Sequence, residues 1–407
     1  MNPPTRSGPH APTPVFGMTL ADYAASRGTH PQALRHEYLE LMRHGVGLTL
    51  PSVTRSETQD GVVKFCLPAG DQRDARLETE SVIIPMHSYR CTDWYTLCLS
   101  SQIGCRMACT FCETGRMGWL RNLSAAEIVA QRLVARAVMQ QSTPPARHPY
   151  RYFGDGIQNV VFMGMGEPLD NFDNLVQAIR VLQEPNGLAF PLSQITVSTV
   201  GRIDGLRKLA ALVRAEEDCT RRVSDHSRRV SDRSRRGPDR SRREPDRRRP
   251  GGTPDGPGWA NLRLAISLNA PNDRLRDALM PINRGMPLAE LQRALLEYPL
   301  GRKGRYLIEY VMLKDVNDAL EHADQVAAWC RPLPCVVNLI PYNPQRDAPY
   351  AAPSEATIFA FLRRLRAHGI FVKRRITHGR DLMGACGQLG NPELRRAVLS
   401  PEISPES

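Results

Sequence analysis

Three cysteines lie close together in the chain, at positions 105, 109 and 112. Their spacing, C-x3-C-x2-C, allows three thiolates to hold three corners of a cubane iron–sulfur cluster, whereas four cysteines would close a cluster used only for electron transfer. The fourth iron then keeps an open coordination position, as the metal of a catalytic site does. The alternative for Cys105, Cys109 and Cys112 is a zinc site completed by a distant Cys or His, although zinc ribbons prefer paired C-x2-C motifs. The spacing therefore favours a catalytic iron–sulfur cluster.

A second motif combines glycines with one carboxylate, because residues 163–168 read Met-Gly-Met-Gly-Glu-Pro. Glycine allows the backbone to approach a ligand closely, and the Glu167 carboxylate can accept hydrogen bonds from an ammonium group. Small polar residues also fall at the ends of predicted strands: Ser198, Ser267 and Asn343. These residues could bind a cofactor. The simpler alternatives stay open: a glycine-rich turn with a solvated Glu167, and polar side chains that only hydrogen-bond at strand ends.

The three-cysteine loop resembles that of the radical S-adenosylmethionine superfamily. The resemblance implies a [4Fe–4S] cluster on Cys105, Cys109 and Cys112, with S-adenosylmethionine bound to the fourth iron. It also implies that Gly166 and Glu167 hold the amino group of that molecule. Cleavage of S-adenosylmethionine to a 5′-deoxyadenosyl radical would supply the difficult chemistry, and the protein would supply orientation.

Two more cysteines point to one family within this superfamily. Cys98 lies on a predicted strand just before the motif, and Cys386 lies between glycines beyond the last predicted strand. Both surroundings resemble the Cfr/RlmN family of radical S-adenosylmethionine RNA methyltransferases. The likeness extends over roughly residues 58–390 without 221–258, and its other matching segments are residues 118–123, 164–169, 270–273, 281–283 and 338–341. The remaining cysteines are expected to be inert: Cys66, Cys91, Cys219, Cys330 and Cys335.

The resemblance implies a mechanism with two molecules of S-adenosylmethionine per turnover. Cys386 would take a methyl group from the first, and the radical from the second would abstract hydrogen from that methyl group. The resulting carbon radical would add to C2 or C8 of adenine in ribosomal RNA, tRNA or both. Cys98 would then form a disulfide with Cys386 and free the product, while Glu80 would accept a proton. An external electron donor such as flavodoxin is implied as a partner.

The sequence departs from the family in three places. The family's Ser-Leu-His reads Ser267-Leu268-Asn269 here, and these three residues are expected to bind cofactor together with Ser198 and Asn343. The family's Thr-Arg-Gly-Asp-Asp reads Thr-His-Gly-Arg-Asp at residues 377–381, and residues 1–55 do not match its N-terminal RNA-binding domain. The alternative function is therefore a radical S-adenosylmethionine enzyme of the same fold that acts on a protein or a small molecule.

The elements that would position these residues follow a regular order. From about residue 94, nearly continuous apolar runs alternate with stretches of helical spacing, which predicts a parallel sheet buried on both faces. Six such units suit an α/β fold with a partial (βα)6 barrel, in which chemistry sits at the C-terminal strand ends. The predicted strands are residues 95–99, 159–163, 194–198, 262–268, 306–313, 336–340 and 370–376. The predicted helices are residues 124–139, with a Ser124–Glu127 capping box, 174–182, 205–213, 288–297, 320–329 and 354–368.

The remaining segments flank or interrupt this core of residues 91–220 and 259–392. Residues 1–17 are expected to be a disordered leader, and residues 393–407 a C-terminal tail. Residues 18–90 are expected to be a small α+β extension, with two short helices over residues 19–42 and strands at residues 61–68 and 78–85. Residues 221–258 repeat a seven-residue Arg-rich unit without an apolar seam, which predicts a disordered insertion. This insertion is either a dispensable loop or an auxiliary RNA tether.

Composition sets outer limits on the function. The chain has 407 residues, of which 41% are hydrophobic and 24% charged, so most of it can bury a core. It has no apolar run of about 18 residues and no apolar signal segment near Met1, which predicts a cytoplasmic protein without membrane association. We expect it to be a monomer. The net charge is +12, but the insertion contributes +7 of it, with 13 Arg and 6 acidic residues. Net charge alone is therefore weak support for RNA binding.

Overall fold

The computed structural model describes residues 14–69, 77–87, 93–142, 155–234, 258–345, 348–375, 379 and 382–390, with the backbone alone for Asp93, Ser142 and residues 220–234. The predicted Cys91, residues 377–378 and 380–381, and the C-terminal tail lie outside this part of the chain.

One ten-stranded sheet organises the described residues, in the order β1-β2-β3-β4-β7-β8-β9-β10-β11-β12. Its strands from β4 onward pair in parallel, as the apolar runs predict. They are β4 (Asp93–Cys98), β7 (Ile157–Phe162), β8 (Ile195–Thr199), β9 (Arg263–Ser267), β10 (Tyr306–Met312), β11 (Cys335–Pro341) and β12 (Val372–Arg374). The partial barrel predicted from strand–helix alternation is confirmed.

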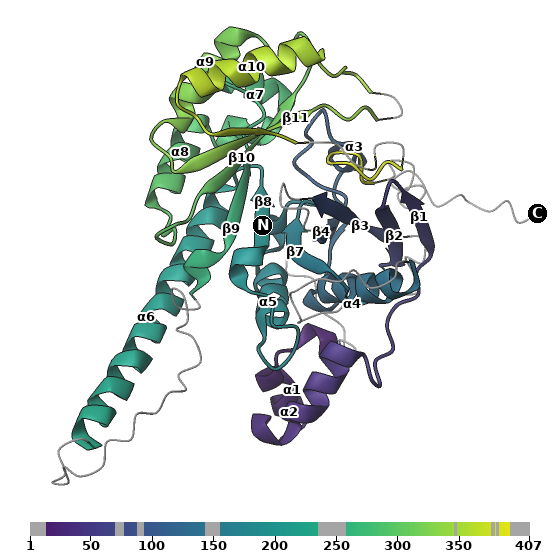
Figure 1. Ribbon diagram of the computed structural model, residues 1–407, viewed down its shortest axis with the longest axis vertical. Helices are drawn as coiled ribbons and strands as arrows, with labels where there is room; N and C mark the ends of the chain where they lie inside the picture. The colour runs from purple at the N-terminus through teal and green to yellow at the C-terminus, as the bar shows by residue number, and fades with distance from the viewer. Residues whose placement is uncertain are drawn as a thin grey trace, which may run out of the picture.

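Helices connect these parallel strands and cover the outer face of the sheet (Figure 1). They are α3 (Glu113–Met117), α4 (Ala125–Ser142), α5 (Phe172–Gln183), α6 (Ile203–Ser234), α7 (Asp273–Leu279), α8 (Leu288–Glu297), α9 (Leu320–Cys330) and α10 (Glu355–Ala367). The sequence did not predict α3 or α7, because both are too short to show a helical period. The apolar faces of sheet and helices form one large buried core.

Three antiparallel strands extend the sheet beyond β4: β1 (Arg55–Gln59), β2 (Val62–Pro68) and β3 (Glu78–His87). The polar, exposed β1 was not predicted. Two helices precede them as expected, α1 (Leu20–Ser26) and α2 (Pro31–Leu39). Part of the expected disordered leader is folded, because Val15–Gly17 forms a 3-10 helix (η1) whose apolar side chains pack on the core.

Helix α6 corrects the expected insertion. It was predicted to end near residue 213, but it continues to Ser234 and projects from the barrel as a long rod (Figure 1). The disorder predicted from residue 221 is therefore wrong for residues 221–234. Extending a helix costs less than nucleating one, and arginine favours helix, so a chain without a core can continue an existing helix. Residues 235–257 lie outside the described chain.

Short elements complete the fold: η2 (Glu40–His44), β5 (Gln102–Ile103), β6 (Arg121–Asn122), η3 (Pro168–Asn171), η4 (Leu192–Gln194), η5 (Trp259–Asn261) and η6 (Pro281–Gly285). In the described residues, no helix combines the length and the apolar character that crossing a bilayer requires.

Candidate active site

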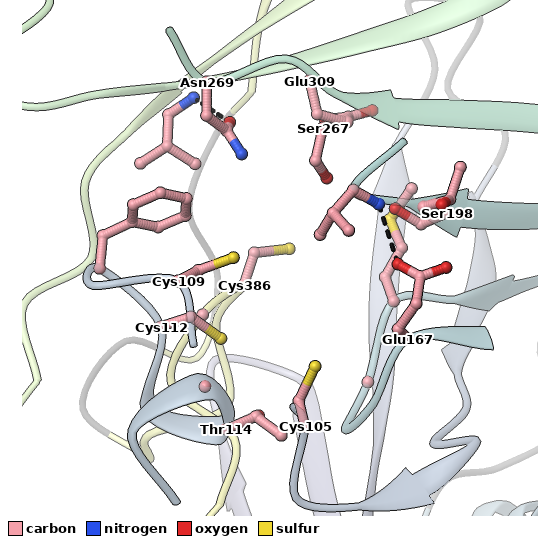
Figure 2. Close-up of a pocket in the computed structure, with 18 of the residues that line it drawn as sticks. Cys105, Cys109, Cys112, Thr114, Glu167, Ser198, Ser267, Asn269, Glu309 and Cys386 are labelled. Carbon is pink, nitrogen blue, oxygen red and sulfur yellow. Dashed lines mark hydrogen bonds between the residues drawn. The ribbon is translucent and has the colours of Figure 1, made fainter. Parts of the chain in front are cut away.

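A pocket at the C-terminal ends of the parallel strands brings together most of the predicted site residues (Figure 2). The three-cysteine loop forms one side, and the segments after β7, β8 and β9 form the other. The predicted residues that line it are Cys105, Cys109, Cys112, Gly166, Glu167, Ser198, Ser267, Asn269 and Cys386. Four predicted residues do not line this pocket: Glu80, Cys98, Leu268 and Asn343.

The sulfur atoms of the three loop cysteines point into this pocket (Figure 2). Backbone hydrogen bonds fix the loop, since Cys105 donates to the Gly118 carbonyl at 3.0 Å and Cys112 to that of Cys109 at 3.1 Å. Burial raises the pKa of all three thiols. Bound metal provides the positive charge that keeps buried sulfurs deprotonated, so three such thiols suit a metal group. A single zinc ion needs ligands that meet at one point, and the described residues contain no such group of three or more.

Glu167 has a buried carboxylate that faces the three cysteines across the pocket (Figure 2). Its Oε2 accepts the Val200 N–H at 2.9 Å, and its Oε1 accepts the Leu169 N–H at 3.1 Å. Burial raises the pKa of this carboxyl to about 7. A carboxylate in this environment has unused acceptor sites and favours a cationic partner such as an ammonium group.

Gly166 is required by close backbone packing. Its φ of +104° is strained for other residues, and a Cβ there would lie 2.6 Å from the Cβ of Gln102. Gln102 in turn accepts the Glu167 N–H at 2.8 Å through its Oε1. The glycine therefore lets the Glu167 segment pack against the strand that leads into the cysteine loop.

The β9 end carries Ser267 and Asn269 into the pocket but not the side chain between them. Leu268 is fully buried in the core and its side chain does not line the pocket, so its predicted contact with cofactor stays a prediction. Asn269 adopts a φ of +54°, which asparagine tolerates well. Its Oδ1 accepts the Val311 N–H at 2.9 Å, so the residue that replaces the family's histidine links β9 to β10.

Arg276 of α7 organises these strand ends and was not predicted. It is fully buried, and its guanidinium donates to the carbonyls of Leu268 at 3.1 Å, Ser267 at 3.1 Å and Val200 at 2.5 Å. Buried carbonyls at strand ends need such donors. A single arginine in a charged helix carries no sequence signal for this role.

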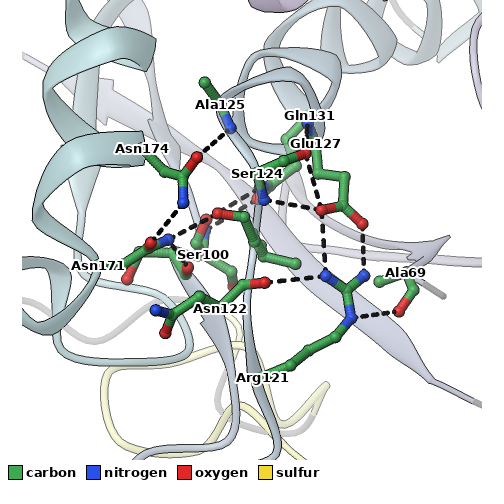
Figure 3. Close-up of polar contacts among 12 residues, drawn as sticks. Ala69, Ser100, Arg121, Asn122, Ser124, Ala125, Glu127, Gln131, Asn171 and Asn174 are labelled. Carbon is green, nitrogen blue, oxygen red and sulfur yellow. Dashed lines mark hydrogen bonds and ion pairs between the residues drawn. The ribbon is translucent and has the colours of Figure 1, made fainter. Parts of the chain in front are cut away.

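A polar network holds the segments that lead into and out of the cysteine loop (Figure 3). Gln131 of α4 accepts the Ser100 N–H and donates to the Ser100 carbonyl, both at 2.9 Å. Asn171 donates to the carbonyls of Ser101 at 2.8 Å and Leu123 at 2.7 Å.

The N-terminal end of α4 is capped as predicted. Ser124 and Glu127 form the capping box, and Arg121 pairs with the same Glu127. The loop is thus held by the ends of β4, α4 and α5.

Cys386 reaches the pocket because its segment is fastened to the cysteine loop. Glu113 donates its N–H to the Gly387 carbonyl at 2.7 Å, and Gln345 donates to the carbonyls of Phe111 at 2.8 Å and Gly387 at 3.2 Å. Asn343 donates to the Cys386 carbonyl at 3.2 Å. Asn343 therefore helps to position Cys386, and its predicted role in binding cofactor stays a prediction.

A second cavity lies inside the barrel on the other side of Cys386. Cys386, Met163, Glu309, Ile340 and Arg375 line both cavities. Polar and cationic side chains from the strands also line the second one: Thr96, Asn159, Thr196, Arg263, Asn338, Lys373 and Arg374. Cys386 thus borders two spaces of different chemistry.

Cys98 is buried on β4, close enough to Cys386 for the two thiols to interact electrostatically. Burial raises the pKa of Cys98 to about 12, and a charged Cys386 would raise it further. The Arg375 guanidinium acts in the opposite direction on Cys98, and proximity to Cys386 raises the pKa of Arg375 itself. This cation, which the sequence did not single out, lies where it can stabilise either thiolate.

Glu80 lies behind the Cys386 segment and lines neither cavity. Its carboxylate pairs with Lys64 at 2.9 Å and accepts the Gly390 N–H at 3.2 Å. Lys64 also donates to the Met383 carbonyl at 3.1 Å. The buried pair therefore ties β2 and β3 to the segment on both sides of Cys386, and the proton-accepting role of Glu80 stays a prediction.

Comparison with known proteins adds an independent finding. The chain is 38% identical over 344 residues to a probable dual-specificity RNA methyltransferase RlmN 1 of Protochlamydia amoebophila. The matched region covers 84% of this chain and 77% of that protein. It is 36% identical over 344 residues to the dual-specificity RNA methyltransferase RlmN of Desulfotalea psychrophila, with 84% and 78% covered. No model of a protein family matches the chain.

A solved structure agrees with the sequence relatives. The chain matches the crystal structure of a radical S-adenosylmethionine methyltransferase from Sphaerobacter thermophilus with a TM-score of 0.68 and 30% identity, over 93% of this chain and 99% of that one. The fold, the arrangement of the site and the sequence relatives point the same way. The chain belongs to the Cfr/RlmN family of radical S-adenosylmethionine RNA methyltransferases and is an enzyme that catalyses methyl transfer.

Proposed function

We propose that this enzyme methylates C2 or C8 of an adenine in ribosomal RNA, tRNA or both, with Cys386 as the methyl carrier. The observation that carries the proposal is the position of Cys386 between two cavities. A carrier must meet the methyl donor on one side and the acceptor on the other, and the two linings differ accordingly. RNA as the substrate is supported by the names of the relatives.

The first cavity suits the cofactors. Cys105, Cys109 and Cys112 would hold a [4Fe–4S] cluster, and Glu167 would bind the amino group of S-adenosylmethionine. Gly166, Ser198, Ser267 and Asn269 would line the remainder of that molecule. When bound, the cluster supplies the electron that cleaves S-adenosylmethionine and so provides a radical able to abstract hydrogen.

Cys386 performs the transfer in the proposed sequence. Its sulfur attacks the methyl group of a first S-adenosylmethionine, so that an S–C bond forms and the donor's sulfonium–methyl bond breaks. Loss of one hydrogen atom from this S-methyl group leaves a carbon radical, which forms a C–C bond with the adenine carbon. Such a carrier is needed because that aromatic carbon is not a nucleophile and cannot take the methyl group from a sulfonium directly.

Cys98 and its neighbours complete the cycle. The adduct would give up one electron, for which the oxidised cluster held by Cys105, Cys109 and Cys112 would be the acceptor, and the proton of the adenine carbon, for which Glu80 is the proposed acceptor. The Cys98 sulfur then attacks the Cys386 sulfur, so that an S–S bond forms, the S–C bond breaks and its electron pair takes a proton to give the methyl product. Arg375 stabilises the attacking thiolate. A dithiol reductant and an external one-electron donor such as flavodoxin would restore the enzyme.

The test compares wild-type enzyme with Cys386→Ala after anaerobic reconstitution with iron and sulfide. Wild-type enzyme is expected to transfer label from S-adenosylmethionine to adenosine in ribosomal RNA or tRNA, and mass spectrometry of the nucleosides identifies the carbon. Cys386→Ala should transfer none while it still holds iron and sulfide, and Cys219→Ala, which removes an exposed thiol, should behave as wild type. RNA methylation by Cys386→Ala would refute the carrier role, and cleavage of S-adenosylmethionine without any labelled RNA would favour a non-RNA substrate.

A further inference from the structure

The N-terminal end of the barrel, opposite the active site, has a cavity of its own. It lies where β8, β9, β10 and β11 begin. The side chains of Arg263, Arg302, Lys303 and Arg305 line it, whereas Glu217 is its one acidic lining residue among those described. Four cationic residues therefore border one cavity at the end of the barrel away from the cysteine loop, and Arg263 also borders the second cavity described above.

Among the residues that the structure describes, these cations have no acidic ion-pair partner. Within the described part of the chain, Arg263, Arg302, Lys303 and Arg305 form no ion pair. Partial burial lowers the pKa of Arg263, and no acidic group offsets this effect. Elsewhere arginines are paired, as Arg364 is with Asp324 at 2.6 Å and Arg374 with Glu355. Unpaired cations gathered in a concave surface attract anions.

The loop that carries three of them is held in place. Gly301 donates its N–H to the Ala260 carbonyl at 3.0 Å, which ties the loop to η5, and Gly304 donates to the Gly301 carbonyl at 2.7 Å. A Cβ on either glycine would lie 3.0 Å from a backbone carbonyl oxygen, so the turn is closely packed. The charged side chains of residues 302, 303 and 305 are exposed above this fixed base.

Helix α6 leaves the barrel at the same cavity, where Glu217 is part of the lining. From there its backbone runs on for about 26 Å to Ser234, away from the barrel (Figure 1). This stretch begins the Arg-rich repeat, with arginines at positions 221, 222, 228, 229 and 233 against two aspartates at 225 and 232. A seven-residue repeat is nearly two helical turns, so equivalent positions return about every 10.5 Å along the rod.

We propose that this end of the barrel is a second RNA-binding surface, where Arg263, Arg302, Lys303 and Arg305 bind phosphate groups and the Arg-rich rod of α6 extends the contact. The inference rests on the proposed RNA substrate and names how the enzyme holds that substrate. Phosphate contacts of this kind position RNA without reading its sequence. Strand β9, which joins this cavity to the Ser267 end, spans about 13 Å. One RNA that contacts both ends must therefore extend beyond the methylated nucleotide.

The test measures binding of a labelled tRNA pool and of labelled ribosomal RNA to the full chain, from about 50 to 300 mM KCl. The loop variant combines Arg302→Gln, Lys303→Gln and Arg305→Gln. It should bind at least about tenfold more weakly at the lowest salt, and the slope of log affinity against log salt should fall by about two to three. Replacing residues 221–257 by a Gly-Ser linker should lower the slope further. The control combines Arg35→Gln, Arg207→Gln and Lys208→Gln, three exposed cations elsewhere, and should keep the wild-type slope to within about one.

The outcomes separate this inference from the proposed function. If wild-type enzyme methylates RNA but the loop variant keeps the wild-type affinity and salt slope, the proposed second RNA-binding surface is wrong. The proposed function would not be affected by that result. An equal loss in the control variant would also overturn the second surface, because the effect would then be one of net charge. Absence of both RNA binding and RNA methylation in wild-type enzyme would refute the function itself. Thermal unfolding midpoints of all variants check that they are folded.

Discussion

Two groups of cysteines meet in the active site, and they differ in how the fold supplies them. Cys105, Cys109 and Cys112 belong to one loop of eight residues, so their short separation along the chain keeps them together. Cys98 and Cys386 come from opposite ends of the domain and meet only because Asn343, Gln345 and the Glu80–Lys64 pair fasten the last segment to the barrel. The arrangement of the three loop cysteines is thus set by local sequence, whereas that of Cys98 and Cys386 depends on the whole tertiary structure.

The difference corresponds to two different chemical tasks. A metal group needs several thiolates at fixed spacing, and a short loop provides that spacing at little conformational cost. A methyl carrier and the thiol that releases its product must approach each other and a large substrate, so they are better placed on separate elements. Arg375 lies beside the second group, where it can stabilise whichever thiolate is formed.

The largest effect is expected from the loop group. Cys109→Ala should reduce both cleavage of S-adenosylmethionine and RNA methylation to background, because two remaining thiolates cannot hold the cluster. Iron and acid-labile sulfide content, measured with both activities, checks this prediction. Full cluster content in Cys109→Ala would show that the loop is not the ligand set, and Cys335→Ala is the matched control with a buried thiol elsewhere.

A more selective effect is expected from Cys98. Cys98→Ala should keep the cluster and still cleave S-adenosylmethionine, but the product cannot leave Cys386 without an attacking thiol. Multiple-turnover methylation should therefore fall by about 100-fold or more, and RNA should become covalently attached to the protein. Denaturing gels of labelled RNA detect the adduct. Cys330→Ala, which removes another buried thiol, is the control and should turn over normally without an adduct. If Cys98→Ala behaves like this control, the proposed pairing of Cys98 with Cys386 is wrong.

The smallest effect is expected in the pH dependence of S-adenosylmethionine binding, through Glu167. Its carboxyl has a pKa of about 7, raised by burial, and only the ionised form attracts an ammonium group. Because deprotonation is favoured above this pKa, affinity for S-adenosylmethionine should fall about tenfold from about pH 8 to about pH 6. Calorimetric titration at both pH values measures this change. Glu167→Gln should bind weakly at both, and a wild-type affinity that does not vary with pH would contradict the role of Glu167.

The difference between local patterns and tertiary contacts also explains which features could be predicted from the sequence. The cysteine loop, the parallel strands and the Ser124–Glu127 cap are local patterns, and the structure confirms the barrel they predict. Arg276 and Arg375 escaped notice because a single arginine has no characteristic spacing, and only tertiary packing places it at strand ends or beside two thiols. The sequence did not show that the Leu268 side chain packs into the core, because the direction of a side chain beyond a strand end depends on tertiary packing. The helical residues 221–234 were missed because the repeat lacks the apolar positions from which helices are inferred.

The central claim is that Cys386 carries the methyl group, and mass spectrometry of the peptide that contains it tests this claim most directly. Enzyme incubated with S-adenosylmethionine that bears an isotopically labelled methyl group should gain the mass of one labelled methyl group at Cys386. After transfer to unlabelled S-adenosylmethionine and addition of RNA, that label should appear in adenosine. Labelled adenosine from an enzyme whose Cys386 is never methylated would contradict the account.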